Sequence, residues 1–275
     1  MISQGLKSPE REHSIHRAWS VDDLIETIIE SVQKSRATDA PFYHLRFDHF
    51  FPDHLYAAML QAMPVSTDYR AMFDQRNGTN SSDGTATRTK IDLFPEYIRH
   101  FPAHKRAVWE TVGRALCSRE LGRAFAQRLA PGLERRFGRN FTKVGMYPLP
   151  ILTRDIPGYR KGAHTDSRWK GITVQLYLPP DNSTTHIGTL FHDRLPSGGK
   201  GPNRTQVPFA PNSGYAFAVG NDTWHSVARV GTEVKTRDSI LLTYFVDAGA
   251  FRFLRNRGRR IGNFVVNELR NLKRR

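Results

Sequence analysis

Four short apolar runs, separated by turn-forming residues, constrain the fold of this chain more than any other feature. The runs are Ile172–Leu178, Thr189–Phe191, Val207–Phe209 and Tyr215–Val219. Short apolar runs bounded by Gly, Pro, Asn and Asp are typical of β-strands. A barrel-like sheet needs such strands to carry the chain round and bring its ends together. We therefore expect a β-rich core that begins near residue 141.

Two histidines and one aspartate flank these runs. His164 and Asp166 are two residues apart, so in an extended strand both side chains point to the same side and reach one metal ion. The third ligand must come from a distant strand, and three histidines follow: His186, His192 and His225. We choose His225, because it lies where a barrel-like chain returns. Two histidines and one carboxylate occupy one face of an iron ion and leave three positions open.

A second candidate site follows at the strand expected over 239–246. Arg237 and Ser239 are again two residues apart and share a face. A guanidinium beside a hydroxyl suits a carboxylate, which arginine binds through two parallel hydrogen bonds. Eleven residues separate His225 from Arg237, and Lys235 lies inside that gap as an alternative carboxylate anchor. We prefer Arg237, because Ser239 stands beside it on the same face.

In this order, His164-x-Asp166, the distal His225 and Arg237-x-Ser239 resemble the site of Fe(II)/2-oxoglutarate-dependent dioxygenases. The resemblance covers roughly residues 140–248, and the order of the motifs makes it specific, because HxD alone often occurs by chance. It implies an α+β fold with a double-stranded β-helix core, which is a jelly-roll, cupin-like architecture. N-terminal helices would pack on this core, and a basic helix would end the chain.

The resemblance also implies an enzyme, an oxidoreductase of the hydroxylase type. His164, Asp166 and His225 would hold Fe(II), and Arg237 with Ser239 would bind the far carboxylate of the co-substrate 2-oxoglutarate. O2 would be the oxidant, and hydroxylation of an aliphatic C–H bond is the commonest outcome. Halogenases with related sites replace the carboxylate ligand by a small residue, so Asp166 disfavours halogenation.

The chain before residue 140 reads as mainly helical. Ser20 caps a helix that carries acids in its first turn, a second helix runs from Pro52 to about Met63, and residues 93–138 predict two or three helices. Phe42–Phe47 predicts a strand. We expect a flexible N-terminus over 1–19, one catalytic domain over 20–250 that is helical to about 138, and a basic amphipathic tail over 251–275.

Two polar segments predict loops. Residues 74–89 contain glycine and many polar side chains, so they form either a plain surface loop or a mobile cover over the active site. Residues 196–204 are rich in Gly and Pro and predict a long inter-strand loop.

The net charge of +15 is concentrated at the C-terminus. Residues 251–275 hold nine Arg or Lys and one acid, a net charge of +8. Apolar residues fall on one stripe of the predicted helix: Ile261, Phe264, Val265, Leu269 and Leu272. A basic amphipathic helix lies on an anionic membrane surface or docks on the protein's own core. Nucleic acid is less favoured as a partner, because no aromatic stacking platform accompanies the basic run.

Two absences bear on where the protein works. Cys117 is the single cysteine, so no internal disulfide forms, and a reducing compartment is expected. The sequence has neither a secretory signal nor a run of about 18 apolar residues that could cross a membrane. We expect a cytoplasmic protein that is peripheral on the inner face of the membrane if the tail binds there.

The substrate is constrained by charge alone. Basic residues precede the first ligand at Arg154, Arg160 and Lys161, and together they suit a small or lipid-linked acidic substrate, such as an anionic saccharide. Each of them alone is more often simply exposed. Two alternatives remain open: a nucleic-acid dealkylase of the same superfamily, and a non-catalytic β-helix module that binds membranes or protein partners.

Overall fold

The structure of the chain is a computed structural model that describes residues 20–72, 81, 83–247, 258 and 262. The predicted flexible N-terminus 1–19 lies outside the described residues. So does most of the first half of the predicted loop 74–89, and all of the predicted tail 251–275 except Gly258 and Gly262.

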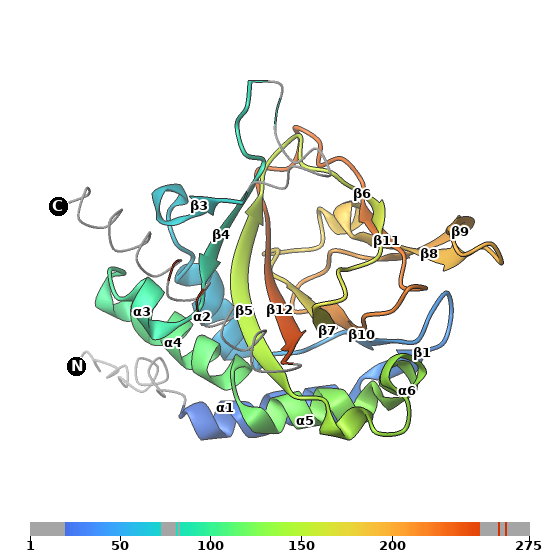
Figure 1. The fold of residues 1–275 in the computed structure, drawn as a ribbon. Helices are drawn as coiled ribbons and strands as arrows, with labels where there is room; N and C mark the ends of the chain where they lie inside the picture. The colour runs from blue at the N-terminus through green and yellow to red at the C-terminus, as the bar shows by residue number, and fades with distance from the viewer. Residues whose placement is uncertain (1–19, 73–80, 82, 248–257, 259–261, 263–275) are drawn as a thin grey trace, which may run out of the picture.

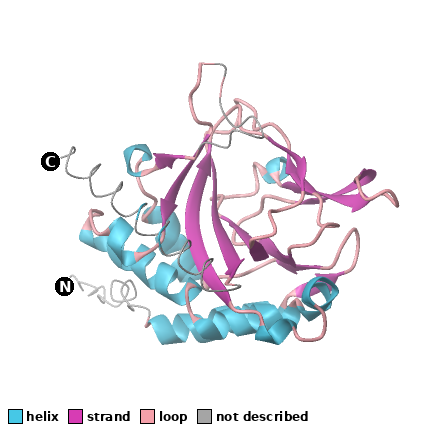
Figure 2. Cartoon of the chain, in the orientation of Figure 1, coloured by secondary structure: helices cyan, strands magenta, loops and turns pink. Residues whose placement is uncertain are grey.

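The helices gather on one side of a large sheet, with a smaller sheet on its other side (Figures 1 and 2). Their bounds are α1 Val21–Lys34, α2 Asp53–Gln61, α3 Pro95–Ile98, α4 Ala103–Leu116, α5 Arg119–Arg128 and α6 Ala130–Phe137. Residues 93–138 therefore form four helices rather than two or three. The extra breaks have local causes, because Pro102 precedes α4 and the side chain of Ser118 caps α5.

The strands form two antiparallel sheets. The eight-stranded sheet has the order β1 Arg36–Thr38, β2 His44–Phe47, β10 Gly214–Ala218, β7 Lys170–Tyr177, β12 Arg237–Val246, β5 Met146–Asp155, β4 Arg88–Asp92 and β3 Arg70–Ala71. The four-stranded sheet has the order β6 Lys161–His164, β11 His225–Val227, β8 Thr189–Arg194 and β9 Lys200–Val207.

From β5 to β12 the chain passes repeatedly between the two sheets, except that β8 and β9 follow each other as an antiparallel pair within the small sheet. Strands β5, β7, β10 and β12 lie in the large sheet, whereas β6, β8, β9 and β11 lie in the small one. Eight strands wound between two facing sheets make a double-stranded β-helix, so the predicted α+β jelly-roll architecture is confirmed. The first half contributes more strands than expected, because β1 and β2 extend one edge of the large sheet and β3 and β4 extend the other.

The large sheet separates two apolar clusters, because successive side chains of a strand point to opposite faces. On β12, Ile240 and Leu242 belong to the cluster that the helices cover. Arg237, Ser239 and Leu241 alternate with them and therefore face the small sheet. Between the sheets lies a second, aromatic-rich cluster that includes Phe191 and Phe217.

One predicted loop is a loop only in its first half and a strand in its second. Residues 196–204 were expected to connect two strands, but β9 begins at Lys200 and pairs with β8. It is an edge strand with mostly exposed side chains, so it needs no apolar alternation, and Pro202 is tolerated there.

Among the described residues, no helix has the length and the apolar content needed to cross a membrane.

Candidate metal centre

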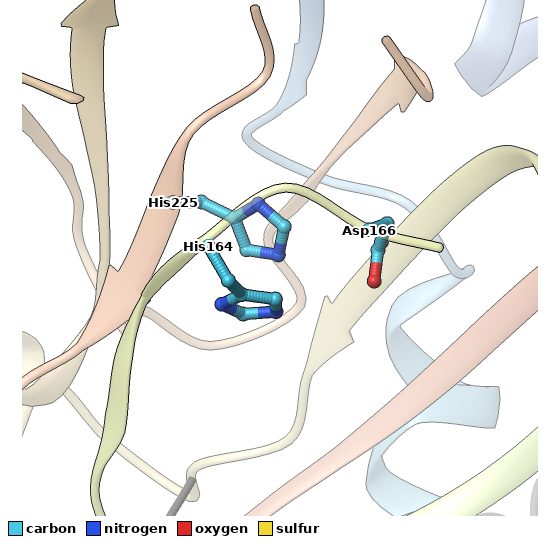
Figure 3. Close-up of side chains that lie close together, drawn as sticks. All are labelled: His164, Asp166 and His225. Carbon is cyan, nitrogen blue, oxygen red and sulfur yellow. The ribbon is translucent and has the colours of Figure 1, made fainter. Parts of the chain in front are cut away.

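Strand pairing brings the two histidines of the predicted triad together. His164 is the last residue of β6 and His225 the first of β11, and the two residues are direct partners across the antiparallel pair. Their ring centroids are 4.3 Å apart. Asp166 follows β6 by two residues, outside the strand, and its side chain lies beside the two imidazoles (Figure 3). Ligand atoms of all three side chains lie within 4.8 Å of one another.

Both imidazoles are oriented by the backbone. Nδ1 of His164 donates to the carbonyl of Gly162 at 2.9 Å, and Nδ1 of His225 donates to the carbonyl of Thr223 at 3.0 Å. A proton held on Nδ1 leaves Nε2 with its lone pair, so each ring presents one metal-ligating nitrogen in a fixed tautomer.

The carboxylate of Asp166 is held at both oxygens. Lys170 Nζ donates to Oδ1 at 2.6 Å, and Thr173 Oγ1 donates to Oδ2 at 2.7 Å. Burial by itself would raise the pKa of Asp166, but the positive charge of Lys170 and these two hydrogen bonds hold it below the ordinary value. Asp166 is therefore ionised at neutral pH.

Burial also sets the protonation of the histidines. It lowers the pKa of His225 to about 4 and lowers that of His164 as well. Two neutral imidazoles and one carboxylate are the protonation states that metal ligation requires. This donor set fits Fe(II), because two histidines and one carboxylate on one face leave the other positions open.

The two other candidate histidines lie away from this cluster. His192 is buried, and its Nε2 is 2.7 Å from Ser226 Oγ. His186 is exposed and pairs with Glu233 at 3.3 Å. Among the described residues, His164, Asp166 and His225 are the group whose geometry could hold a metal ion.

A cavity of about 430 Å³ borders the three ligands. Its lining consists of Met72, Arg88, Tyr159, Lys161, His164, Thr165, Asp166, Ser167, Lys170, Thr173, Gln175, Tyr215, His225, Val227 and Leu241. Three of these side chains, Arg88, Lys161 and Lys170, are cationic, while Asp166 is the acid among them. The cavity therefore favours an anionic ligand beside the triad.

The predicted carboxylate anchor lies next to this cavity rather than in its lining. Arg237 is 1% exposed, and its Nη1 donates to Asp155 Oδ2 at 2.9 Å. Ser239 is fully buried, with its Oγ 2.9 Å from Thr153 Oγ1 and 2.5 Å from Gln175 Nε2. The structure thus brings Arg237 and Ser239 to the inner face of β12, where neighbouring side chains engage them.

A second cavity of about 610 Å³ shares Thr165 and Asp166 with the first. Its lining consists of Phe42, Tyr43, Gly132, Arg135, Arg136, Phe137, Thr165, Asp166, Arg168, Ala218, Val219, Gly220, Asn221, Asp222 and Thr223. Three arginines face two acids in this lining. Arg135 pairs with Asp222 at 3.2 Å, and Arg136 donates to the carbonyls of Val219 and Arg168 at 2.7 and 2.6 Å.

Two features of the site have no clear signal in the sequence. Arg88 lies inside the predicted loop 74–89, yet it begins β4 and lines the metal cavity. Lys170 and Thr173 of β7 hold the carboxylate of Asp166, although their spacing in the sequence does not indicate this role. Sheet register alone places Arg88 opposite Asp155, 67 residues further along the chain.

Comparisons with known proteins give likenesses of structure and none of sequence. No family model matches the chain, and no curated protein matches its sequence. A prolyl-4-hydroxylase of Pseudomonas putida is 14% identical, with a TM-score of 0.47 over 81% of this chain and 98% of that one. A prolyl hydroxylase of Trichoplax adhaerens, in complex with a hypoxia-inducible-factor peptide, is 12% identical, with a TM-score of 0.49 over 82% and 90%.

A third solved structure, an oxidoreductase of the 2OG-Fe(II) oxygenase family from Burkholderia pseudomallei, is 13% identical. Its TM-score is 0.44 over 85% of this chain and 94% of that one. Because these TM-scores are below 0.5, the assignment of a function has to rest on the side chains of the site.

Proposed function

We propose that this chain is an Fe(II)- and 2-oxoglutarate-dependent oxygenase that hydroxylates an aliphatic C–H bond of an anionic substrate. The observation that carries the proposal is the convergence of His164, Asp166 and His225 within 4.8 Å, beside a cavity lined by three cationic side chains. Fe(II) with 2-oxoglutarate and O2 supplies the oxidising chemistry that breaks the C–H bond.

The chain's own residues position the reactants. The two imidazoles and Asp166 hold one face of the metal, while Thr173 and Lys170 keep the carboxylate oriented. The cationic lining of the cavity would attract the two carboxylates of the co-substrate. Apolar side chains of the lining, among them Val227 and Leu241, limit access of water to the reacting atoms.

The first test is anaerobic addition of Fe(II) and 2-oxoglutarate to the purified protein. We expect a weak charge-transfer band at about 500–530 nm, as for a 2-oxo acid chelated to Fe(II) on this ligand set. Asp166→Ala and His225→Ala should abolish the band. The matched control is His186→Ala, which removes an exposed histidine outside the cluster and should leave the band unchanged.

A second readout is succinate, which should form under O2 with the wild-type protein and not with Asp166→Ala. A wild-type protein that gives neither the band nor succinate contradicts the oxygenase assignment. A band that survives His225→Ala contradicts the choice of the third ligand.

The second cavity supports the substrate class. The lining of this cavity includes Arg135, Arg136 and Arg168 beside Asp166 and Asp222, so an acidic group can approach the metal ligands from this side.

Matched pairs of sugars with and without a phosphate group test whether the substrate is anionic. We expect only the phosphorylated members to stimulate succinate formation, and Arg135→Met with Arg168→Met to reduce that stimulation. Equal stimulation by the neutral members would contradict an anionic substrate.

A further inference from the structure

Arg88 reaches the metal cavity from outside the double-stranded β-helix. It is the first residue of β4, which pairs with β5 at the edge of the double-stranded β-helix. Arg88 lies directly opposite Asp155 in this pair. Its Nε and Nη2 donate to the two oxygens of Asp155 at 2.6 and 2.8 Å. The side chain is 13% exposed and lines the cavity beside the triad.

Asp155 is shared between two arginines. Besides Arg88, its Oδ2 also accepts from Arg237 Nη1 at 2.9 Å, and the carboxylate is fully buried. Burial by itself would lower the pKa of Arg88, but the Asp155 carboxylate raises it above the ordinary value, so Arg88 stays charged. Two guanidinium groups and one carboxylate leave one positive charge unbalanced in a buried place. A carboxylate ligand in the cavity would balance it.

Tyr159 provides a second, independent sign of a ligand at this place. Its ring lies 4.2 Å beneath the Arg88 guanidinium, and it lines the same cavity. The side chain is fully buried, and its hydroxyl has no hydrogen-bond partner among the residues that the structure describes. Burial raises the pKa of Tyr159, so the hydroxyl keeps its proton and can donate. A buried donor without a protein partner is usually satisfied by a ligand, an ion or an ordered water, and a carboxylate in this cavity would satisfy the hydroxyl of Tyr159.

Arg237, in contrast, is engaged by the protein on every side. Its Nε donates to the carbonyl of Ile187 at 2.9 Å, its Nη1 to Asp155, and its Nη2 contacts Thr189 Oγ1 at 3.4 Å. The guanidinium also lies 5.4 and 5.2 Å from the ring centres of Tyr177 and Phe209. This arginine holds Asp155 in place instead of facing the cavity.

We propose that Arg88 and Tyr159 bind the far carboxylate of the 2-oxo acid. Arg237 is then a positioning residue: it takes up the negative charge of Asp155, which leaves the charge of Arg88 for the ligand. The inference rests on the proposed function, because it names the residues that hold the co-substrate of the same site. Arg88, and not the Arg237 that the R-x-S pattern predicts, then contacts the far carboxylate.

The test compares two 2-oxo acids with the same five-carbon skeleton. 2-Oxoglutarate carries the far carboxylate, and 2-oxopentanoate has a methyl group there. Both are titrated anaerobically by calorimetry into Mn(II)-loaded protein, so no turnover is needed. We expect Arg88→Met to raise the Kd for 2-oxoglutarate about tenfold or more and to leave that for 2-oxopentanoate within about twofold. Tyr159→Phe should act in the same direction but less strongly.

The matched control is Arg154→Met. Arg154 sits on β5 next to Asp155 and pairs with Asp238 of β12 at 2.7 Å, on the opposite face of the sheet. Its side chain is 12% exposed, much like that of Arg88, so its loss reports the effect of removing a buried ion pair. We expect this variant to bind both acids like the wild type.

A charge-restoring pair tests the role of Arg237. In Arg237→Met, Asp155 neutralises Arg88 alone, so binding of 2-oxoglutarate should weaken. Adding Asp155→Asn returns the net positive charge to Arg88 and should restore most of the preference for 2-oxoglutarate. A direct contact between Arg237 and the carboxylate predicts no such rescue. If the double variant fails to fold, judged by its melting temperature, the Arg88→Met comparison decides alone.

The outcomes separate the two proposals. A wild-type protein that binds Mn(II) but neither acid overturns the proposed function and this inference with it. A preference for 2-oxoglutarate that survives Arg88→Met overturns the inference and leaves the oxygenase assignment standing. Equal weakening of both acids in Arg88→Met also overturns it, because the loss is then not specific to the far carboxylate.

Discussion

The carboxylate of Asp166 owes its orientation to two neighbours rather than to a regular strand. Thr173 donates to one of its oxygens at 2.7 Å, and Lys170 donates to the other. Outer partners of this kind fix the direction of a metal ligand. We expect Thr173→Val, which keeps the shape and removes the hydroxyl, to weaken Fe(II) binding about 10- to 100-fold. An anaerobic Fe(II) titration measures this.

The control for this prediction is Thr243→Val. Thr243 is buried on β12 and is the direct cross-strand partner of Thr173, so it tests the loss of a nearby buried hydroxyl. We expect it to leave Fe(II) affinity unchanged. Equal losses in the two variants would mean that general packing, and not the hydrogen bond to Asp166, governs the affinity.

At the same scale, some parts of the site can be read from the sequence and others cannot. The spacing of His164 and Asp166 and the position of His225 are local signals, and the structure brings these three side chains together. The Arg88–Asp155 pair depends on the register between β4 and β5 and spans 67 residues. No local pattern records such a register, so Arg88 was expected in a loop.

At the scale of single elements, α1 begins where a capping residue requires it. The side chain of Ser20 accepts from the backbone N–H of Asp23 at 3.0 Å, and Leu24, Ile28 and Val32 are fully buried against the core. We expect Ser20→Ala to lower the free energy of unfolding by about 1 kcal/mol and Ser20→Gly by only a few tenths. Urea unfolding of the two variants measures the difference, and equal losses would contradict a capping role.

The strands differ in how far their sequences specify them. The apolar runs of β7 and β10 predicted those strands closely, because both are buried on their two faces and need continuous apolar side chains. Strand β9 lies at the edge of the small sheet with mostly exposed side chains. Its conformation comes from backbone pairing with β8, so Gly and Pro in its sequence pointed to a loop instead.

At the scale of the whole molecule, charge is distributed unevenly along the chain. Of the net +15, residues 251–275 carry +8, which leaves +7 on the other 250 residues. Electrostatic attraction does not favour docking of the basic tail on the rest of the chain, because the rest of the chain also carries a net positive charge. Of the two partners that the tail sequence favours, the charge balance therefore supports an external anionic surface over the protein's own core.

The tail prediction follows from this balance. Each basic residue near an anionic bilayer contributes about 1 kcal/mol, and the apolar stripe from Ile261 to Leu272 adds to it. We expect the full chain to sediment with phosphatidylserine-containing vesicles at low salt, and to remain in solution with neutral vesicles or at high salt. A chain ending at residue 250 should lose this binding and keep its affinity for Fe(II). Equal sedimentation of the two chains would place the membrane contact elsewhere, and loss of thermal stability on truncation would support docking on the core.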